Sequence, residues 1–454
     1  FVAPRMQVLL SFLGMTLLGV GDATIPAGRE ARLSMHLLVG NGDTASLLAA
    51  KARLEGKPQP LMKVRATAAG EPVAGARVHV TDGEAYRALG RTGADGVATL
   101  PLPPGEYTVE ALSDRRESSG PVQVSHTAAG SSVDAGIEPA GTLLARATES
   151  GQPIPFKLVL FREGASPRTY PRTYGEVRMP ANAHWVHFAG LDGAELPLAA
   201  GRYRAVAQRG FEYDLSEQIV DVAPGQTTTL DFKLTRVVNT TGFVSADFHI
   251  HGAPSPDSDD LLVYKVLSFG AEGLEIPVST DHETIADYEP VVRGLKLERF
   301  MKTMVGSEVT TVTFGHFNAF PMRLLDEPNN GAVRWYNKPA RQIFDEVRRN
   351  PGEPLLQINH PRGGIGSGYF SMIGFDRDSF TADKQEHFFT DFDVMEVLNG
   401  ARFESSEAEV QQDWFAFLRR GHRITGTGNS DSHHSLTSEV GTPRTYVEVG
   451  EDEP

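Results

Sequence analysis

The chain has 454 residues, a net charge of −15 and no cysteine. The lack of cysteine excludes disulfides, zinc–thiolate sites and a cysteine nucleophile, and an acidic chain without a basic stripe gives no strong signal for binding nucleic acid. A hydrophobic fraction of 40% and a charged fraction of 22% describe an ordinary soluble protein, long enough for about three domains.

Residues 1–58 are interpreted as the end of a mainly β domain that begins upstream, since the first residue is Phe rather than Met. The apolar run at 6–20 is consistent with a signal-peptide core or with a pair of buried strands, and it is too short to span a bilayer. The strands are favoured because a turn at 21–28 and a strand at 32–39 continue the same rhythm. No other segment is a candidate for a membrane span.

A short helix is predicted at 45–54, ending at Gly56. Residues 59–135 then predict a β-sandwich of the carboxypeptidase-regulatory or transthyretin-like kind, because alternating strands are separated by turn residues. The segment 103–111 carries a Pro-Gly-x-Tyr turn that opens a strand.

A related segment at 199–207 echoes residues 103–111, so that residues 136–238 predict a second sandwich. Sugar- or surface-binding modules are one interpretation of the two sandwiches. Packing and spacer domains are favoured, because no aromatic cluster marks a ligand platform and a fold alone does not supply a function.

Residues 239–454 alternate strand-like and helix-like patterns, which predicts an α/β domain, expected to be a barrel. Ser258 is expected to cap one helix and Asn337 another. The predicted helices are 258–269, 338–349 and one ending at Gly421, and the predicted strands are 243–250, 273–280, 301–308, 354–359 and 392–398.

Polar motifs follow the strands of this domain. His249 and His251 alternate with apolar residues, so both imidazoles project from the same side of one strand, where they can hold a metal ion. Four further motifs end later segments: Thr280-Asp-His-Glu283, the pair of Glu308 and His316, Asn359-His-Pro-Arg362, and Asp431-Ser-His-His434. A lone His-x-His is weak evidence, but this series predicts a multinuclear metal site.

The donor types define the chemistry of such a site. Imidazole and carboxylate ligands without thiolate suit Zn, Mn or Fe. A carboxylate such as Glu308 is able to bridge two ions, and clustered ions lower the pKa of a shared water toward ~7.

In order, the motifs His-x-His, Thr-Asp-His, Gly-x-Glu, Gly-His, Asn-His-Pro and Asp-x-His resemble the polymerase-and-histidinol-phosphatase (PHP) family over residues 240–454. The Pro-Ser-Pro-Asp-Ser258 and Gly-His-Phe-Asn318 segments, with sandwiches upstream, look closest to the carbaryl-hydrolase-like (CehA/McbA) branch. The resemblance implies a distorted (β/α)7 barrel that continues beyond Pro454.

The resemblance also implies two or three divalent metal ions and their ligands. The first ion would take His249, His251, Glu308 and Asp431; the second Glu308, His316 and His360; the third Asp257, His282 and His433. Asp257 departs from the commonest pattern, in which a histidine stands at that position, and this puts the third ion in doubt.

Three further residues are candidates for catalytic roles. Asp281 is expected to orient an imidazole, and Arg362 to clamp a phosphoryl or carboxylate oxygen, with a salt bridge at the rim as the alternative. His434, and with it Asn399, are candidates for substrate contact or for structural roles.

Together these observations predict a metal-dependent hydrolase acting on a small-molecule phosphoester, aryl ester or carbamate. The alternative is a non-catalytic surface or assembly protein whose barrel keeps metal for stability. A periplasmic or extracellular location is expected from the sandwich modules, the lack of cysteine and the missing start, with a cytoplasmic location as the alternative.

Overall fold

The computed structural model describes residues 6–12, 15–20, 38–83, 85–164, 168–364, 366–400 and 405–450. Near the N-terminus, β1 (Met6–Phe12) and β2 (Met15–Val20) pair antiparallel, as the strand interpretation of this apolar run predicted. The predicted turn at 21–28 and the predicted strand at 32–39, apart from its last two residues, lie outside the described residues.

The first helix, α1 (Thr44–Glu55), confirms the sequence prediction. Asp43 caps it by accepting a hydrogen bond from the Ser46 amide at 2.8 Å, as short polar side chains do at helix N-termini. Gly56 ends it in the left-handed conformation. Ala45 is buried in the core of the sandwich that follows, so the helix belongs to that unit.

The first sandwich (residues 61–136) consists of two four-stranded sheets around one core. One sheet has the order β6-β5-β8-β9, and the other has β10-β3-β4 with β7 also paired to β3. Its strands are β3 (Leu61–Ala68), β4 (Glu71–Pro72), β5 (Arg77–Asp82), β6 (Ala85–Arg91), β7 (Val97–Pro101), β8 (Gly105–Leu112), β9 (Val122–His126) and β10 (Ser131–Gly136). Side chains of β3 alternate between exposed and buried, the period expected of a half-buried strand.

The second sandwich (residues 140–233) repeats this topology strand for strand. Its sheets are β14-β13-β16-β17 and β12-β11-β15 with β18 also paired to β11. Its strands are β11 (Ala140–Glu149), β12 (Gln152–Pro153), β13 (Phe156–Arg162), β14 (Trp185–Ala189), β15 (Ala194–Ala199), β16 (Gly201–Gln208), β17 (Ser216–Val222) and β18 (Thr227–Lys233).

The recurring sequence segment has the same hydrogen bond in both sandwiches. The Tyr107 hydroxyl donates to the Pro103 carbonyl oxygen at 2.8 Å, and the Tyr203 hydroxyl donates to the Ala199 carbonyl oxygen at 2.8 Å. Both tyrosines are buried, so each phenol packs its ring in the core and satisfies its one polar atom locally. The echo in the sequence therefore marks two structurally equivalent corners.

The C-terminal region (residues 239–450) contains two larger sheets. The first has the order β21-β20-β19-β29 and the second β22-β23-β24-β27-β28. Their strands are β19 (Phe243–Ile250), β20 (Ile276–Ser279), β21 (Met304–Val305), β29 (Thr445–Glu448), β22 (Ser307–Thr311), β23 (Gly315–Phe320), β24 (Leu355–Ile358), β27 (Val394–Asn399) and β28 (Thr425–Asn429), and a separate pair is β25 (Phe375–Asp376) with β26 (Thr381–Ala382).

Single bridges connect these two sheets at two places: Ile250 pairs with Ser432, and His282 pairs with Glu308. The pairings β22–β23 and β23–β24 are antiparallel, unlike those of a regular (β/α) barrel. What the structure shows is thus a β-rich, multidomain chain with few helices.

Gly306 divides the predicted strand 301–308 between the two sheets, with β21 before it and β22 after it. A Cβ atom at this position would lie 2.8 Å from the Ala319 carbonyl oxygen. Only glycine allows so close an approach of two backbone segments, and the crossing brings Glu308 to the start of a new strand.

Helices cover the outside of these sheets, and their apolar side chains complete the cores. They are α2 (Leu262–Ala271), α3 (Glu289–Gly294), α4 (Ala340–Val347), α5 (Tyr369–Ile373) and α6 (Ser405–Arg419), with 3-10 turns η3 (Pro328–Gly331) and η4 (Gln385–His387). None of the helices in the described part of the chain is long and apolar enough to cross a membrane.

Two predicted helix starts are wrong. The helix expected from Ser258 begins at Leu262, because the Ser258 hydroxyl donates to the His433 carbonyl oxygen instead of capping. The helix expected after Asn337 begins at Ala340, behind Pro339. A tertiary contact in the first case and a proline in the second place the start of the helix later than local propensity suggested.

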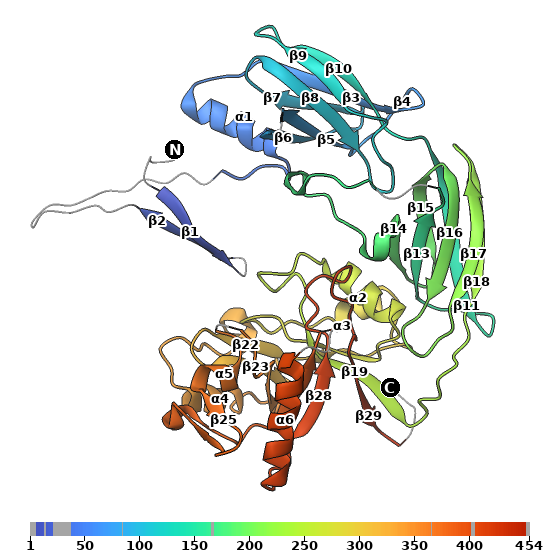
Figure 1. Ribbon diagram of the computed structural model, residues 1–454. Helices are drawn as coiled ribbons and strands as arrows, with labels where there is room; N and C mark the ends of the chain where they lie inside the picture. The colour runs from blue at the N-terminus through green and yellow to red at the C-terminus, as the bar shows by residue number, and fades with distance from the viewer. Residues whose placement is uncertain are drawn as a thin grey trace, which may run out of the picture.

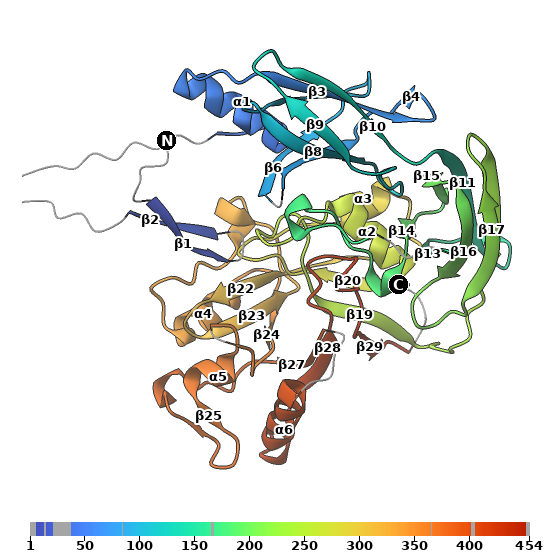
Figure 2. The same cartoon turned by 45° about the horizontal axis from the view of Figure 1, so that its top comes forward.

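Figure 1 shows the first sandwich at the top, the second at the right and the C-terminal region at the bottom, and Figure 2 shows the same arc after rotation. The second sandwich contacts the C-terminal region through Lys157, whose ammonium group lies 2.6 Å from Glu272 Oε1 and 2.7 Å from Glu439 Oε1. Its long connection between β13 and β14, which contains η1 (Arg172–Tyr174) and η2 (Pro180–Asn182), contacts the first sandwich.

Candidate metal centre

The histidine pair of β19 points into the C-terminal region, and both side chains are fully buried. His249 Nδ1 donates to Glu396 Oε1 at 2.9 Å, and His251 Nδ1 forms a hydrogen bond with Ser255 Oγ at 3.0 Å. With each Nδ1 bound in this way, each Nε2 is the free nitrogen. Neither Nε2 atom has a hydrogen-bond partner among the described residues.

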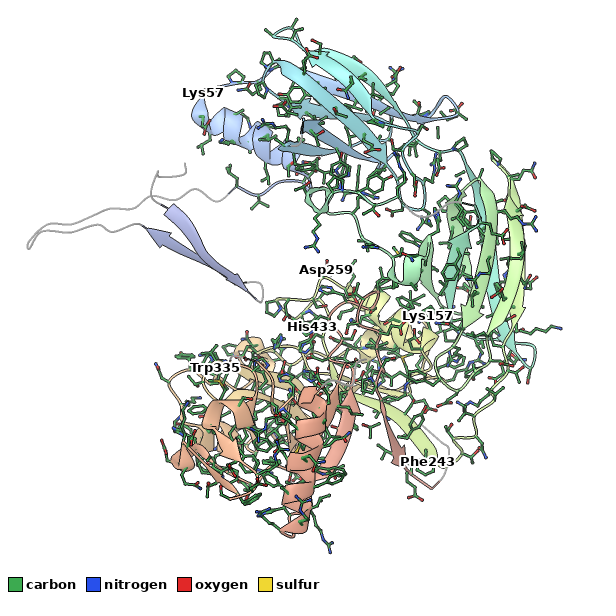
Figure 3. The ribbon with its side chains drawn as sticks, viewed as in Figure 1. Lys57, Lys157, Phe243, Asp259, Trp335 and His433 are labelled. Carbon is green, nitrogen blue, oxygen red and sulfur yellow. The ribbon has the colours of Figure 1, made fainter. Side chains whose placement is uncertain are left out.

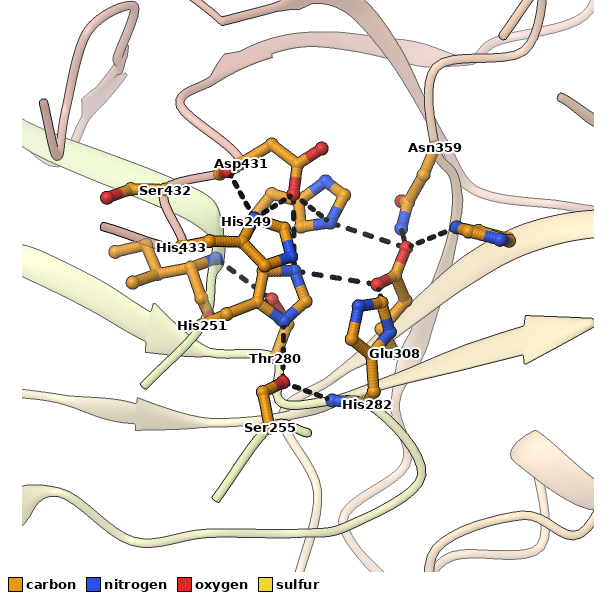
Figure 4. Close-up of polar contacts among 12 residues, drawn as sticks. His249, His251, Ser255, Thr280, His282, Glu308, Asn359, Asp431, Ser432 and His433 are labelled. Atoms are coloured by element: carbon orange, nitrogen blue, oxygen red, sulfur yellow. Dashed lines mark hydrogen bonds and ion pairs between the residues drawn. The ribbon is translucent and has the colours of Figure 1, made fainter. Parts of the chain in front are cut away.

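These two free nitrogens face two carboxylates (Figure 4). Asp431 Oδ1 lies 3.2 Å from both Nε2 atoms. Glu308 contributes Oε1, 3.3 Å from His249 Nε2, and Oε2, 3.5 Å from His251 Nε2. Four side chains from three separate stretches of chain thus converge, through five donor atoms, on one small region.

Glu308 also faces a second group of imidazoles. Its Oε1 lies 3.2 Å from His316 Nδ1 and 3.8 Å from His360 Nε2. Asn359 Nδ2 donates to the same oxygen at 2.8 Å, which fixes the orientation of the carboxylate. Glu308 therefore contacts the histidines of two neighbouring groups, the position that a bridging ligand requires.

A third group surrounds Asp257. Its Oδ2 lies 3.2 Å from His282 Nε2 and 3.2 Å from His433 Nε2, and its Oδ1 has no hydrogen-bond partner among the described residues. The rings of His282 and His433 both stack near His251, with centroids 4.4 and 4.1 Å from it and 5.7 Å from each other. The aspartate therefore lies where its two predicted partners converge.

Charge interactions keep the central carboxylates ionised. Burial raises the pKa of Glu308, but the neighbouring His282, His249 and His316 outweigh it and hold that pKa well below the usual range. The pKa of Asp431 is likewise held well below its usual value, chiefly by His249 against the effect of burial. Two anionic carboxylates among imidazoles provide the charge that a divalent cation requires.

The backbone is strained at two of these positions. Asp431 has φ of 51° and His360 has φ of 27°, both in the left-handed region that residues other than glycine rarely adopt. Such conformations cost about 1–3 kcal/mol each and persist where the surroundings enforce them, often at functional sites. Here they turn a carboxylate and an imidazole toward the same point.

The residues present fit a multinuclear metal site. Six buried donor atoms of the centre have no hydrogen-bond partner among the described residues, where buried polar atoms are normally paired: His249 Nε2, His251 Nε2, Asp257 Oδ1, Glu308 Oε2, His360 Nδ1 and Asp431 Oδ1. Four overlapping groups have ligand atoms within 4.8 Å of one another: His249/His251/Glu308, Glu308/His316/His360, His251/His282/His433 and His249/His360/Glu396.

Sequence reasoning missed Glu396, which lies on β27 with a fully buried side chain. It accepts from His249 Nδ1 on one oxygen and from the His360 backbone amide at 2.7 Å on the other. A carboxylate that orients a ligating imidazole is a recurring feature of metal sites. The available signal was a single glutamate inside the otherwise apolar run 394–398.

Lys265 was also missed, because a lysine within a helix is usually solvated. Its ammonium group is fully buried and contacts Asp260 Oδ2 at 3.0 Å and the Ser432 carbonyl oxygen at 3.2 Å. Ser432 stands between Asp431 and His433. Lys265 therefore holds the backbone that carries two candidate ligands.

The three candidates outside the ligand set lie elsewhere than expected. Asp281 accepts from the Gly252 amide and the Tyr288 hydroxyl, at 2.8 Å each, and has no imidazole partner among the described residues. Arg362 forms a two-fold ion pair with buried Asp413, at 2.7 and 3.0 Å, which favours the salt-bridge alternative.

His434 is half exposed and pairs with Asp259 Oδ1 at 2.8 Å. Figure 3 shows Asp259 and His433 on the side of the C-terminal region that faces the first sandwich. Asn399 Nδ2 donates to Glu396 Oε2 at 3.0 Å and to Asp431 Oδ2 at 3.2 Å, so its amide supports the carboxylates of the centre.

No protein-family model matches this chain, and none of the curated proteins matches it. Among solved structures, it is similar to a two-domain protein from Bacteroides vulgatus ATCC 8482 that contains a predicted PHP-like metal-dependent phosphoesterase, with 22% identity and a TM-score of 0.30 over 43% of this chain and 54% of that one. The Bacillus anthracis TIE protein aligns at 14% identity and a TM-score of 0.18, over 42% of this chain and 36% of that one.

A minor pilin of Streptococcus agalactiae, GBS52, aligns at 15% identity and a TM-score of 0.21 over 40% of this chain and 98% of the pilin. This chain thus spans about half the length of the Bacteroides protein and 36% of the length of the Bacillus protein. Because all three TM-scores are low, the metal assignment depends on the donor atoms described above.

Proposed function

We propose that the C-terminal region is a metal-dependent hydrolase. The observation that carries this proposal is the convergence of buried, unpaired imidazole and carboxylate atoms on Glu308 and Asp431. A buried polar atom without a partner costs free energy, so a protein with six of them in one place is built to receive a group that satisfies them.

We assign the donors to three ions, as the PHP resemblance implies. The first ion would be held by His249, His251, Glu308 and Asp431; the second by Glu308, His316 and His360; the third by Asp257, His282 and His433. Mixed nitrogen and oxygen donors suit Zn, Mn or Fe, and such ions supply Lewis acidity and a water with a lowered pKa.

Polar side chains behind the ligands hold them in position. Glu396 accepts from His249 Nδ1, and Ser255 Oγ is hydrogen-bonded to His251 Nδ1, which leaves both Nε2 atoms facing the centre without a hydrogen-bond partner among the described residues. Asn359 holds Glu308 in one orientation through Oε1. This arrangement prepares the ligands before any ion arrives, which is how partners behind the ligands act in metal sites.

We further propose a small-molecule substrate with a phosphoester bond, or with an aryl ester or carbamate bond if the CehA/McbA resemblance is the closer one. We also interpret the two bridged sheets as the distorted barrel that the resemblance implies, with domains at 59–135, 136–238 and 239–454. The two bridges at Ile250 and His282 support this interpretation.

The test combines metal analysis with a panel of phosphoesters, aryl esters and carbamates, each assayed with and without chelator. The full-length chain is expected to retain two or three divalent ions and to hydrolyse at least one class, with chelator removing the activity. The double variant His249→Ala/His251→Ala is expected to keep both sandwiches folded and to lose metal and activity. Full metal occupancy in that variant contradicts the ligand assignment, and metal without turnover on any substrate favours a structural role.

A periplasmic or extracellular location is a separate proposal, suggested by the two sandwich modules. It is tested by fractionating cells that produce the full-length gene product. Recovery in the cytosolic fraction alone contradicts it.

A further inference from the structure

The junction of the two sandwiches contains a cavity rich in arginine. It has a volume of about 170 Å³ and lies where the connection between β13 and β14 contacts β8 and the turn that follows it. Five arginines line it: Arg77, Arg115, Arg116, Arg168 and Arg178. So many cations around one small cavity are unexpected in a chain with a net charge of −15.

Two of these arginines have carboxylate partners. Arg77 lies 2.6 Å from Asp114 Oδ1 and 2.7 Å from Glu176 Oε1. Arg168 lies 3.3 Å from Glu110 Oε1. These pairs hold the two sandwiches together and leave little of their charge for another ligand.

The other three have no carboxylate partner within 4.0 Å among the described residues. Arg115 and Arg116 use only Nε, which donates to the carbonyl oxygens of Pro197 and Glu138 at 2.9 and 2.8 Å. Their terminal nitrogens have no acceptor in the described part of the chain. Arg178 is exposed and has no hydrogen bond or ion pair there.

The acidic residues of the cavity wall are already engaged. Asp114 and Glu176 pair with Arg77, and Glu117 Oε1 accepts from the Arg168 backbone amide at 3.0 Å. They therefore do not serve as partners for Arg115, Arg116 or Arg178.

Two neutral donors of the same wall are also unpaired. Trp185 Nε1 and Tyr170 OH are buried atoms without a hydrogen-bond partner among the described residues. The Arg115 guanidinium lies over the Trp185 ring, with Cζ 4.8 Å from its centroid, which holds that cation at the wall. The wall thus offers charged and neutral hydrogen-bond donors and few free acceptors.

We propose that this cavity binds a small oxyanion: the phosphate, sulfate or carboxylate group of a small molecule. Guanidinium groups match such groups with paired, charge-assisted hydrogen bonds. The volume suits one such group rather than an extended chain, and junctions between domains are common places for ligand sites. This site is separate from the metal centre, and the proposal does not depend on the hydrolase function.

The test is calorimetric titration of the full chain with inorganic phosphate, inorganic sulfate and glucuronate at constant ionic strength. The double variant Arg115→Gln/Arg116→Gln is compared with Arg65→Gln/Arg87→Gln, which removes the same charge from exposed positions outside the cavity. Wild type and the control are expected to bind at least one probe saturably, and the cavity variant to bind it at least about tenfold more weakly, the scale for loss of charge-assisted bonds. The probe that binds most tightly identifies the source of the oxyanion.

Phosphate also has affinity for metal centres, so only binding that differs between the cavity variant and the control counts. Equal affinity in both, or no saturable binding of any probe to the wild type, overturns the proposal. If the double variant fails to fold, the single variant Arg178→Gln, at an exposed side chain, decides the matter by the same comparison, with a several-fold loss expected.

Discussion

Two buried clusters of histidine and carboxylate occur in this protein, and they differ in what is left unpaired. At the junction of the two sandwiches, His79 of β5 contacts Glu176 of the β13–β14 connection through Nε2 at 2.9 Å and Tyr86 through Nδ1 at 3.1 Å, and Arg77 completes the set. None of these atoms is buried without a partner. The sandwich cluster is therefore closed upon itself.

The cluster around Glu308 is open. His249 and His251 each use one ring nitrogen for a hydrogen bond with Glu396 or Ser255 and leave the other free, facing carboxylates that are also incompletely paired. Both clusters contain the same residue types, so composition does not separate a structural ion pair from a metal centre. The unpaired atoms do, since a closed cluster has nothing to offer a ligand.

The sharpest test of this difference is Glu308→Gln, which keeps the shape and removes the charge. A neutral amide bridges two dications poorly, so the second ion should be lost more readily than the first, which keeps His249, His251 and Asp431. Turnover should fall at least ~100-fold, the scale for loss of a preorganised electrostatic group. Metal stoichiometry and melting temperature are measured side by side, and unchanged stoichiometry with unchanged turnover means that Glu308 does not bridge.

The second-largest effect on the metal centre is expected from Glu396→Gln. The change leaves an amide oxygen to accept from His249 Nδ1 but removes the negative charge behind the imidazole, and it weakens the contact with the His360 amide. Metal affinity should fall about 10- to 100-fold, as observed for partners behind metal ligands. Competition with a chromogenic chelator measures this affinity, and an unchanged value contradicts the supporting role of Glu396.

A smaller effect on the metal is expected from Lys265→Met, which removes the buried ammonium group behind Ser432. The loop that carries Asp431 and His433 should loosen, and metal affinity should fall roughly three- to tenfold, less than for a direct partner of a ligand. Lys157→Met is the matched control, because Lys157 is also buried and paired but lies where the second sandwich contacts the C-terminal region. It should lower stability without changing metal content, and equal metal loss in both variants refutes the proposed role.

Glu176→Gln in the closed cluster is expected to leave the metal content unchanged. It should lower the stability of the protein instead. Burial raises the pKa of Glu176, but hydrogen bonds from His79 and Arg77 outweigh it and lower the value from 4.5 to about 2. Because the folded-state pKa is depressed, the stabilisation is complete above about pH 4.5 and disappears as the pH falls toward 2.

Wild type should therefore exceed Glu176→Gln by roughly 2 kcal/mol in free energy of unfolding at neutral pH, and the two should converge in acid. Denaturant unfolding at several pH values measures this difference. A constant difference across that range, or a loss of metal in the variant, contradicts the description of a closed structural cluster.

Much of the metal centre could be predicted from the sequence because its donors follow strands. The alternation of β19 places His249 and His251 on one face, and each later motif ends a strand or follows one. The supporting residues could not be predicted in the same way. Glu396 is an isolated carboxylate in an apolar run and Lys265 an ordinary residue of a helix, and only the tertiary structure shows what either of them contacts.

The fold was predictable where local chemistry determines it and less so where distant contacts do. The tyrosine corners of the two sandwiches depend on residues four positions apart and were visible as an echo. The start of α2 was not visible in the sequence, because Ser258 forms a hydrogen bond with a residue 175 positions away. The partners of Asp281 and Arg362, Tyr288 and Asp413, could not be predicted for the same reason, since they carry no signature in the motifs, and the Arg362 pair is the salt-bridge alternative.

The bridge between Ile250 and Ser432 has a consequence for biosynthesis. It joins the first strand of the C-terminal region to the loop after its last parallel strand, and the nearby hydrogen bond from Ser430 to Asp247 spans 183 positions. During translation, the histidine pair leaves the ribosome long before Asp431 is made, while the sandwiches, synthesised earlier, are able to fold first. The full set of candidate ligands therefore comes together only after the segment that carries Asp431 has been synthesised.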